Sequence, residues 1–583
     1  MNQFRRLIFL AILVVELAVL LPALRAQTPH DAVQKFFKGY FEAKLSDEPE
    51  FATGAGHYEN ADRWTDWSKA GRGRRRARME ETLRGLDKFP LANLPEEDQL
   101  SARLLRYQLQ AELDSGDLET HLLRVGQLYG AHNRVYLLMD RMPARTERDY
   151  RNILGRLHGV PAYVDQDIAI LNEAIERGIV QPTVVVDLVI KQMTAQVAQD
   201  QAATPLLAAF RNFPLNFPED ERKKLREEAV ASYEGEFLPS WRKLLDYMKT
   251  TYAPKARPAV SLGSLKGGKE YYAILVRRLT TTNATPEEIH RTGEAEVARL
   301  EAEMLAAAHE TGFTGTLEEF EKKLDAMPEQ HFHSKEEMLV YCRNVAKIIE
   351  PELPNQFRHI PLLLYGIRAI PEDREQASAS NAQSPAPDGS VPGWFNLNAY
   401  QPEKQVKYDK ESLVLHEAVP GHIFQTSLAR SQQGLPEFRR FYGNSAYLEG
   451  WALYAESLGS QLGVYRDPYS RFGRLASERF RAVRRVVDTG IHEMGWTREQ
   501  ALDYFQKHAP QESVAEIDRY ISWPGQALAY KMGQLEILKL RKEAEGKLGP
   551  KFDIRDFHDV ILRDGVLPLE LLDELGQEYI SAK

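Results

Sequence analysis

The stretch Asp149–Gly178, DYRNILGRLHGVPAYVDQDIAILNEAIERG, decides the fold class. Its apolar residues recur at intervals of three and four, which places them along one face of a helix. Gly178 is typical of a residue that ends a helix, and Gln181-Pro182 of a segment that begins the next one. The same periodicity continues along most of the chain. The sequence therefore predicts a mainly all-α protein.

A second long helix is predicted further along the chain. It starts at Thr285-Pro286-Glu287-Glu288 and runs as an amphipathic segment to Ala308. The threonine can cap the helix, proline suits its first turn, and Glu288 completes a capping box.

Two adjacent segments interrupt the helical pattern. Residues 377–392, ASASNAQSPAPDGSVP, predict a loop. The following residues 393–398, GWFNLN, alternate between apolar and polar side chains and predict a short β-segment. We expect a substrate to pair with this strand through its backbone, with Phe395 and Asn396 as substrate-binding candidates. The alternative is a small hairpin that closes the core.

The length and composition are those of a large folded protein. The chain has 583 residues, of which 43% are hydrophobic, and its formal net charge is −9. No basic footprint dominates, so we expect no nucleic-acid partner. The basic run RGRRRAR at residues 72–78 indicates either a solvated helical face or a patch that binds polyanions. A proline-containing stretch at residues 253–258 predicts a boundary between an N-terminal helical lobe, 27–255, and a catalytic helical lobe, 256–583.

The first residues predict an export signal. Arg5 and Arg6 precede an apolar run from Leu7 to Leu24, and the small residue Ala26 follows it. This is the pattern of a signal peptide, residues 1–26, cleaved near Ala26; the alternative is an uncleaved anchor. We therefore expect a periplasmic or secreted protein without a stable membrane span after signal removal. Cys342 is the single cysteine, so no intramolecular disulfide can form.

The residues 413–422, LVLHEAVPGH, carry the chemistry. Zinc hydrolases hold their metal with neutral imidazoles and place a carboxylate next to the bound water. His416 and His422 are six residues apart, which on an undistorted helix turns the second ring away by about 240°. Pro420-Gly421 can distort the helix and bring the two rings together again. The alternative is a chance pair of histidines on a core helix.

A third metal ligand is predicted 27 residues beyond His422, at Glu449. Two histidines and one glutamate leave a fourth position for water, as a catalytic zinc requires, and we expect one zinc ion. Glu456 lies about 10 Å further along the same helix, so it suits an outer position next to a ligand. Glu417 follows the first ligand directly and is the predicted base that activates the water.

The segments HEAVPGH, YLEGWALYAE and RYISWPGQALAYKMG resemble the bacterial family labelled domain of unknown function 885. The likeness includes GIVQP at residues 178–182 and SVPGWFNLN at residues 390–398, and covers most of the chain after residue 26. That family is similar to helical zinc peptidases that take a third ligand from a downstream glutamate. The resemblance implies a large helical peptidase-like fold with a deep cleft.

Similar helical peptidases use tyrosine hydroxyls from a late helix to stabilise the oxyanion. By that resemblance Tyr530, and less strongly Tyr520, are catalytic candidates, although aromatic residues at helical spacing also fit a core. Gln526 and Lys531 are candidates for contact with the substrate backbone or carboxylate, and ordinary surface contacts are the alternative.

Arg484, Asp488 and His492 are four residues apart and share one helical face. His492 is a candidate donor to the transition state, and Asp488 a candidate acceptor that orients a ligand histidine. A buried structural network is the alternative. Together these patterns predict a zinc peptidase that hydrolyses short peptides. Another zinc-dependent amide or ester hydrolase, or a non-catalytic helical metal- or peptide-binding protein, are the other readings.

Overall fold

The protein is described here from a computed structural model that covers residues 28–117, 119–362, 364–375, 378–386 and 391–583. It is mainly α-helical with one three-stranded sheet, which confirms the predicted fold class. The expected signal peptide and its cleavage site lie outside the described residues. None of the described helices combines the length and the hydropathy needed to cross a membrane.

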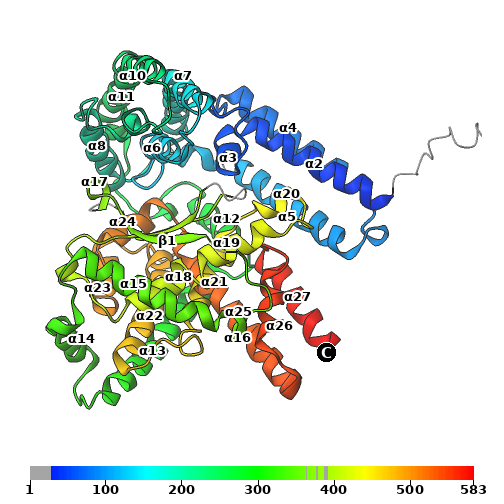
Figure 1. The fold of residues 1–583 in the computed structure, drawn as a ribbon, viewed down its shortest axis with the longest axis vertical. Helices are drawn as coiled ribbons and strands as arrows, with labels where there is room; N and C mark the ends of the chain where they lie inside the picture. The colour runs from blue at the N-terminus through cyan, green and yellow to red at the C-terminus, as the bar shows by residue number, and fades with distance from the viewer. Residues whose placement is uncertain (1–27, 118, 363, 376–377, 387–390) are drawn as a thin grey trace, which may run out of the picture.

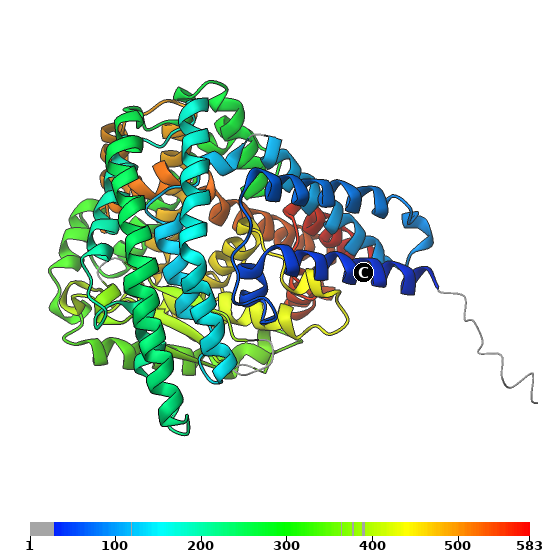
Figure 2. The same cartoon turned by 90° about the horizontal axis from the view of Figure 1, so that it is seen from above.

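The helices before residue 255 are α2 (Pro29–Asp47), α3 (Pro49–Gly54), α4 (Lys69–Leu86), α5 (Glu96–Asp117), α6 (Ala131–Arg141), α7 (Glu147–Arg177), α8 (Thr183–Val197), α9 (Ala208–Arg211), α10 (Glu219–Ser232) and α11 (Leu238–Tyr247). Figure 2 shows α7 lying alongside the run from α10 to α11.

The elements that follow, up to the sheet, are α12 (Gly268–Thr280), α13 (Pro286–Glu310), α14 (Leu317–Asp325), α15 (Lys335–Ile349), α16 (Leu353–Gln356), β1 (Tyr365–Ala369), α17 (Glu372–Glu375), β2 (Asn381–Gln383) and β3 (Gly393–Leu397). The last helices are α18 (Lys410–Glu417), α19 (His422–Ser431), α20 (Glu437–Arg440), α21 (Ser445–Glu456), α22 (Pro468–His492), α23 (Arg498–His508), α24 (Ala515–Ser522), α25 (Ala529–Leu548), α26 (Ile554–Leu562) and α27 (Leu569–Ala582).

The two long helices predicted from the sequence are confirmed. Helix α7 ends at Gly178, whose φ of 70° is the left-handed conformation that glycine adopts without strain. Helix α13 begins with the predicted capping box, in which Thr285 and Glu288 exchange side-chain-to-backbone hydrogen bonds.

The apolar cores join segments that are far apart in the sequence. One core lies within residues 61–252 and includes α6, α7 and α11. A larger core combines α2 and α5 with α15, the sheet, the helices from α18 to α21 and those from α25 to α27. Helices α22, α23 and α24 pack with α13 and α14 in a separate core. The first helices therefore pack against the C-terminal half of the chain. The expected lobe boundary falls in the short 3-10 helix Ala253–Lys255 and stays a prediction.

The predicted β-segment is present as β3, at the centre of the sheet, whose strand order is β1-β3-β2. Strand β3 pairs with β1 in parallel and with β2 in antiparallel register, so both of its edges are occupied. The expectation that a substrate pairs directly with β3 is therefore wrong, because β2 stands at that edge of the sheet instead. Figure 1 shows the sheet between the N-terminal helices and the helices of the C-terminal half.

Candidate metal centre

The two histidines of HEAVPGH belong to two different helices. Helix α18 ends at Glu417, directly after His416, and α19 begins at His422. The intervening residues form a sharp break that contains a cis Val419–Pro420 bond. A Cβ atom on Gly421 would lie 1.9 Å from the backbone oxygen of His416, so only glycine fits this close return of the chain. The predicted distortion is thus a complete interruption of the helix.

This break brings both rings against the carboxylate of Glu449, near the start of α21. The His416 and His422 ring centroids are 4.8 Å apart. The Nε2 atoms of His416 and His422 lie 3.5 and 3.3 Å from Oε2 of Glu449. One ligand atom from each of the three residues falls within 4.8 Å of the other two. The three predicted ligands therefore converge at one point.

The spacing of these atoms fits a tetrahedral metal. Zinc–nitrogen and zinc–oxygen bonds of roughly 2.0–2.1 Å at tetrahedral angles separate neighbouring ligand atoms by about 3.3 Å. The observed distances of 3.3 and 3.5 Å match this value. A direct charge-assisted hydrogen bond would be shorter, at about 2.7–2.9 Å. The residues present thus fit a zinc ion bound by two histidines and one glutamate.

The other nitrogen of His416 is occupied by a second carboxylate. Nδ1 of His416 lies 2.8 Å from Oε1 of Glu456, which is fully buried at the end of α21. Arg481 of α22 places Nη2 3.6 Å from the same oxygen. This arrangement leaves Nε2 of His416 as the atom that faces Glu449. A carboxylate in this outer position fixes the orientation of the ring and raises its basicity as a ligand.

The charges at the centre favour a cation. Burial alone would lower the pKa of His416, but Glu449 and Glu456 raise it to about 10. Burial would raise the pKa of Glu449, but His422 and His416 bring it well below its ordinary range. Three carboxylates, those of Glu417, Glu449 and Glu456, thus surround two imidazoles. Arg481 offsets one of these negative charges, and when both imidazoles are neutral, as metal ligands must be, a divalent cation balances the other two.

Glu417 is buried and directly follows His416, so the charges of both histidines and of Glu449 act on its carboxyl group. Burial raises its pKa above the ordinary value, and the two histidine rings offset part of this effect. A carboxylate with a raised pKa is a better proton acceptor, and this is the property that a general base requires.

Helix α25 approaches α21 closely and brings Tyr530 to the cluster. A Cβ atom on Gly450 would lie 2.3 Å from Cα of Gly533, so the two helices cross at a pair of glycines. Glu449 directly precedes Gly450, and Tyr530 lies one turn before Gly533. The ring of Tyr530 stacks on that of His416 at a centroid distance of 6.3 Å.

The hydroxyl of Tyr530 is held by an arginine that the sequence analysis missed. Arg519 of α24 donates from Nη2 to the Tyr530 oxygen at 3.1 Å, which leaves the phenol proton available. Arg484 of α22 lies over the same ring, 4.8 Å from its centroid, and Glu516 bonds both arginines. Arg519 directly precedes Tyr520 in the segment RYISWPGQALAYKMG. No sequence pattern indicates its role, which is seen only from its hydrogen bond to Tyr530.

Tyr520, His492 and Asp488 are not brought to the cluster. The Tyr520 hydroxyl donates to Glu516. His492 accepts from the backbone N–H of Leu262 at Nδ1, and its Nε2 bonds the Tyr520 carbonyl. Asp488 accepts from the Tyr272 hydroxyl and from the backbone N–H of Gly525, with no contact to either ligand histidine. These residues form the buried network that was the alternative.

The four predicted substrate-binding residues also have other partners. Phe395 is fully buried in the large core, and Asn396 bonds Arg368 and Asn381 across the sheet. Lys531 is fully buried and pairs with Glu478 and Glu296. Gln526 accepts a hydrogen bond from Arg519, which also donates to the Tyr530 hydroxyl. Of the four, only Gln526 is connected to the centre, through these two hydrogen bonds of Arg519.

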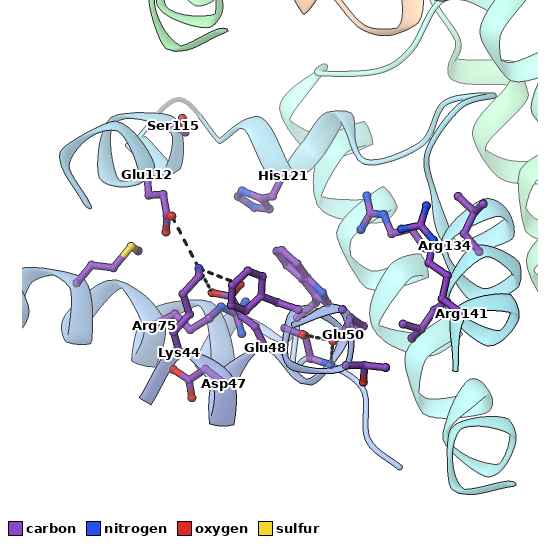
Figure 3. Close-up of a pocket in the computed structure, with 18 of the residues that line it drawn as sticks. Lys44, Asp47, Glu48, Glu50, Arg75, Glu112, Ser115, His121, Arg134 and Arg141 are labelled. Atoms are coloured by element: carbon purple, nitrogen blue, oxygen red, sulfur yellow. Dashed lines mark hydrogen bonds and ion pairs between the residues drawn. The ribbon is translucent and has the colours of Figure 1, made fainter. Parts of the chain in front are cut away.

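A large cavity lies outside the candidate centre. Its volume is about 1080 Å³, and none of the three ligand residues lines it. Figure 3 shows its walls, which come from α2, α4, α5 and α6. Residues 382–386, at the edge of the sheet, and Arg430 of α19 complete the wall.

Comparison with known proteins gives a family but no activity. The family model described as "Bacterial protein of unknown function (DUF885)" matches residues 49–575, and the chain belongs to this family. The expected resemblance is thus confirmed, whereas the likeness to zinc peptidases stays a prediction. No curated protein matches the chain.

Two solved structures share the fold. The chain is similar to a protein from Colwellia psychrerythraea named as a candidate lipoprotein, with a TM-score of 0.90, 25% identity, and coverage of 96% of this chain and 100% of that chain. It is also similar to a candidate lipoprotein of unknown function from Shewanella oneidensis, with a TM-score of 0.72, 18% identity, and coverage of 93% and 99%.

Proposed function

We propose that this member of the DUF885 family is a zinc-dependent peptidase that hydrolyses short peptides, with Glu417 as its general base. The observation that carries the proposal is the convergence of His416, His422 and Glu449 within 4.8 Å. Two imidazoles and one carboxylate form a donor set that zinc hydrolases use, and it leaves a coordination position open. Zinc bound there supplies Lewis acidity, which acidifies a water molecule and polarises the scissile carbonyl.

Glu417 performs the proton transfers in this proposal. Its carboxylate takes a proton from the attacking water, whose oxygen forms the new bond to the carbonyl carbon. As the carbon–nitrogen bond breaks, the same carboxyl group gives that proton to the leaving amine. Burial of Glu417 raises its pKa, which makes its carboxylate a stronger base than an exposed one.

Tyr530 is the proposed donor to the oxygen on which negative charge develops. Its hydroxyl accepts from Arg519, so its own proton can point toward a substrate. A donor fixed in position before the reaction stabilises the oxyanion without reorganisation. Gln526 keeps Arg519 in place through a second hydrogen bond of 2.7 Å.

Another zinc-dependent amide or ester hydrolase would use the same residues, because the site chemistry acts on any activated carbonyl. A metal-binding protein without turnover has no need of a buried carboxylate beside the ligands. The position of Glu417 therefore favours an enzyme over a binding protein.

We further propose that the protein acts outside the cytoplasm. The apolar run after Arg5 and Arg6 has the pattern of an export signal. The two structural relatives, named as candidate lipoproteins, support the same compartment.

The test is hydrolysis of a peptide library, followed by mass spectrometry, for the wild type and Glu417→Gln. The variant should retain zinc and lose activity by about 10²–10⁴-fold, because it keeps the ligands but lacks the base. Glu545→Gln, a surface substitution on α25, is the matched control and should leave the rate unchanged. Equal cleavage by wild type and Glu417→Gln would reject the proposed base.

A further inference from the structure

The cavity described above is positively charged within a chain whose net charge is −9. Nine lysine and arginine side chains line it, against four aspartates and glutamates. Four of the nine are from the basic run at residues 72–78, so this segment of α4 does not simply face solvent. Its volume of about 1080 Å³ lies at the upper end of small-ligand sites and has room for a short peptide.

The acidic side chains of the cavity already have partners. Lys44 pairs with Glu48 at 2.8 Å and with Glu112 at 3.9 Å. Asp47 pairs with Arg78. Glu50 accepts from the backbone and hydroxyl of Thr65. All four carboxylates of the cavity wall therefore already form ion pairs or hydrogen bonds within the protein.

Several arginines of the wall, in contrast, form no ion pair with any described residue. Arg75 donates to the backbone oxygen of Asp66 and lies over the Trp67 ring. Arg430 donates to the backbone oxygen of Pro385 and lies over Phe441. Arg134, on α6, is partly buried near Arg124. Burial is the main cause that lowers the pKa of each of these three arginines. The carboxylates of Glu48, Asp47 and Asp66 still act on Arg75, whereas no described carboxylate offsets the effect of burial on Arg430. A partly buried cation without a counterion favours an anion from outside the chain.

Two further arginines stand at exposed positions of the same wall. Arg141 follows Arg134 by two helical turns on α6, and Arg278 comes from α12. Neither forms an ion pair within the described ranges. In Figure 3, Arg134 and Arg141 lie across the cavity from Arg75 and Lys44. The positive charge therefore surrounds the cavity and is not confined to one side.

Helix α19 links the cavity to the candidate metal centre, because it begins at His422 and carries Arg430 of the cavity wall. A Cβ atom on Gly393 of β3 would lie 3.1 Å from Ile423, which follows the ligand His422, and 3.3 Å from Pro385 of the cavity wall. Arg430 lies eight residues after His422 on α19, a rise of about 12 Å. An extended peptide covers that distance with about four residues. The edge strand β2 lines the cavity with Ala382 and Gln383 and also contacts α19.

We propose that this cavity binds the carboxylate-bearing part of an acidic peptide substrate, while the scissile bond lies at the metal centre. The substrate class thus rests on the proposed peptidase function, but the binding step does not require turnover. Arg75 and Arg430 contribute paired, charge-assisted hydrogen bonds to carboxylates, and Arg141 and Arg278 attract the peptide at the entrance.

The test measures binding by fluorescence anisotropy on the full-length Glu417→Gln protein, which does not consume its ligand. The probes are a short glutamate-rich peptide with a free C-terminus and its glutamine counterpart with a C-terminal amide, both fluorescein-labelled. The acidic peptide should bind at least about tenfold more tightly, as expected for a few desolvated charge-assisted contacts. Equal affinity for the two peptides would overturn the proposal.

Substitutions locate the site. Arg75→Gln and Arg430→Gln should each weaken binding of the acidic peptide about tenfold and leave the neutral peptide unchanged. Arg141→Gln combined with Arg278→Gln should weaken it about threefold, and since both side chains are exposed this variant does not depend on core packing. Arg291→Gln, on an exposed face of α13 outside the cavity, is the control. Wild-type affinity in the double variant and in Arg430→Gln would overturn the assignment.

A competition experiment distinguishes a site for peptide carboxylates from a site for small free anions. Unlabelled acidic peptide should displace the probe, while citrate at the same concentration should not. Displacement by citrate as effective as by the peptide would show a small-anion site and contradict a peptide subsite. Binding of the acidic peptide by a wild type that cleaves no peptide of the library would refute the peptidase function and leave the binding cavity intact. Cleavage of other peptides but never of the bound acidic ones would contradict the substrate class.

Discussion

The candidate metal centre and the C-terminal end of α22 contain the same residue types but give them opposite kinds of partners. At the metal centre, His416 and His422 face the carboxylates of Glu449 and Glu456. At the end of α22, His492 and Asp488 are one turn apart, yet each bonds neutral groups. The first arrangement gathers negative charge around two imidazoles, and the second leaves one neutral imidazole in the core. Whether a buried histidine can bind a metal therefore depends on the groups that contact it, and the presence of a nearby acidic residue in the sequence is not enough.

The pKa values express this difference. Two carboxylates raise the pKa of His416 against the effect of burial, to about 10. Burial lowers the pKa of His492 to about 3, and the Tyr520 carbonyl offsets only part of it. Burial also raises the pKa of Asp488 to about 7, although the Tyr272 hydroxyl opposes this shift. The region around Asp488 and His492 therefore favours uncharged groups.

Among the changes that compare these two regions, substitution of Tyr530 should have the largest effect. Tyr530→Phe should lower kcat about 10²-fold with zinc content unchanged, because it removes an oxyanion donor beside His416. Tyr520→Phe should leave kcat close to that of the wild type, since its hydroxyl bonds Glu516. Steady-state kinetics on one cleaved peptide measures both. A greater loss of kcat in Tyr520→Phe than in Tyr530→Phe would reverse the assignment.

Substitution of Glu456 should change the affinity for zinc, and substitution of Asp488 should not. Glu456→Gln should weaken zinc binding about tenfold, because the charge that polarises His416 is lost. Asp488→Asn, the matched change in the other region, should leave zinc affinity unaltered. Competition with a chromogenic chelator gives both dissociation constants. The contrast fails if both variants weaken zinc binding equally.

The smallest effect concerns stability at mild acidity. The folded pKa of His492, about 3, is below the ordinary value of 6.5, so protonation favours the unfolded chain. Its contribution to stability is complete above pH 6.5 and is lost as the pH falls below it. At pH 5.5 the loss is about 1.4 kcal/mol.

His492→Gln should therefore reduce the difference in unfolding free energy between pH 7.5 and pH 5.5 by about that amount. Urea unfolding at the two pH values measures it, with His359→Gln, an exposed ring, as the control. An unchanged difference between the two pH values in His492→Gln would show that this ring is not held neutral.

Local signals in the sequence predict much of the helical fold. The capping box at Thr285 and the glycine stop at Gly178 both determine helix ends through neighbouring residues alone. The pairing of β3 on both sides was not predictable in this way. It depends on β1 and β2, whose residues lie up to 28 positions earlier and carry weak strand patterns.

In the candidate site, too, residues with a local sequence signal were predicted, and residues whose roles depend on tertiary packing were not. His416, His422 and Glu449 were predicted because their types and spacing are those of a known kind of metal site. Arg519 and the Gly450–Gly533 crossing were missed, since their roles arise from the packing of α21, α24 and α25. His492 and Asp488 were placed at the site because helical spacing shows which residues share a face and not what that face contacts.

Metal analysis by mass spectrometry of the purified protein, reloaded with zinc after chelation, tests the central claim most directly. The wild type should hold one zinc ion per chain, and His422→Ala and Glu449→Ala should hold almost none, while His492→Gln retains the wild-type content. Unchanged zinc content in His422→Ala and Glu449→Ala would contradict the account, because the break between α18 and α19 would then hold no metal.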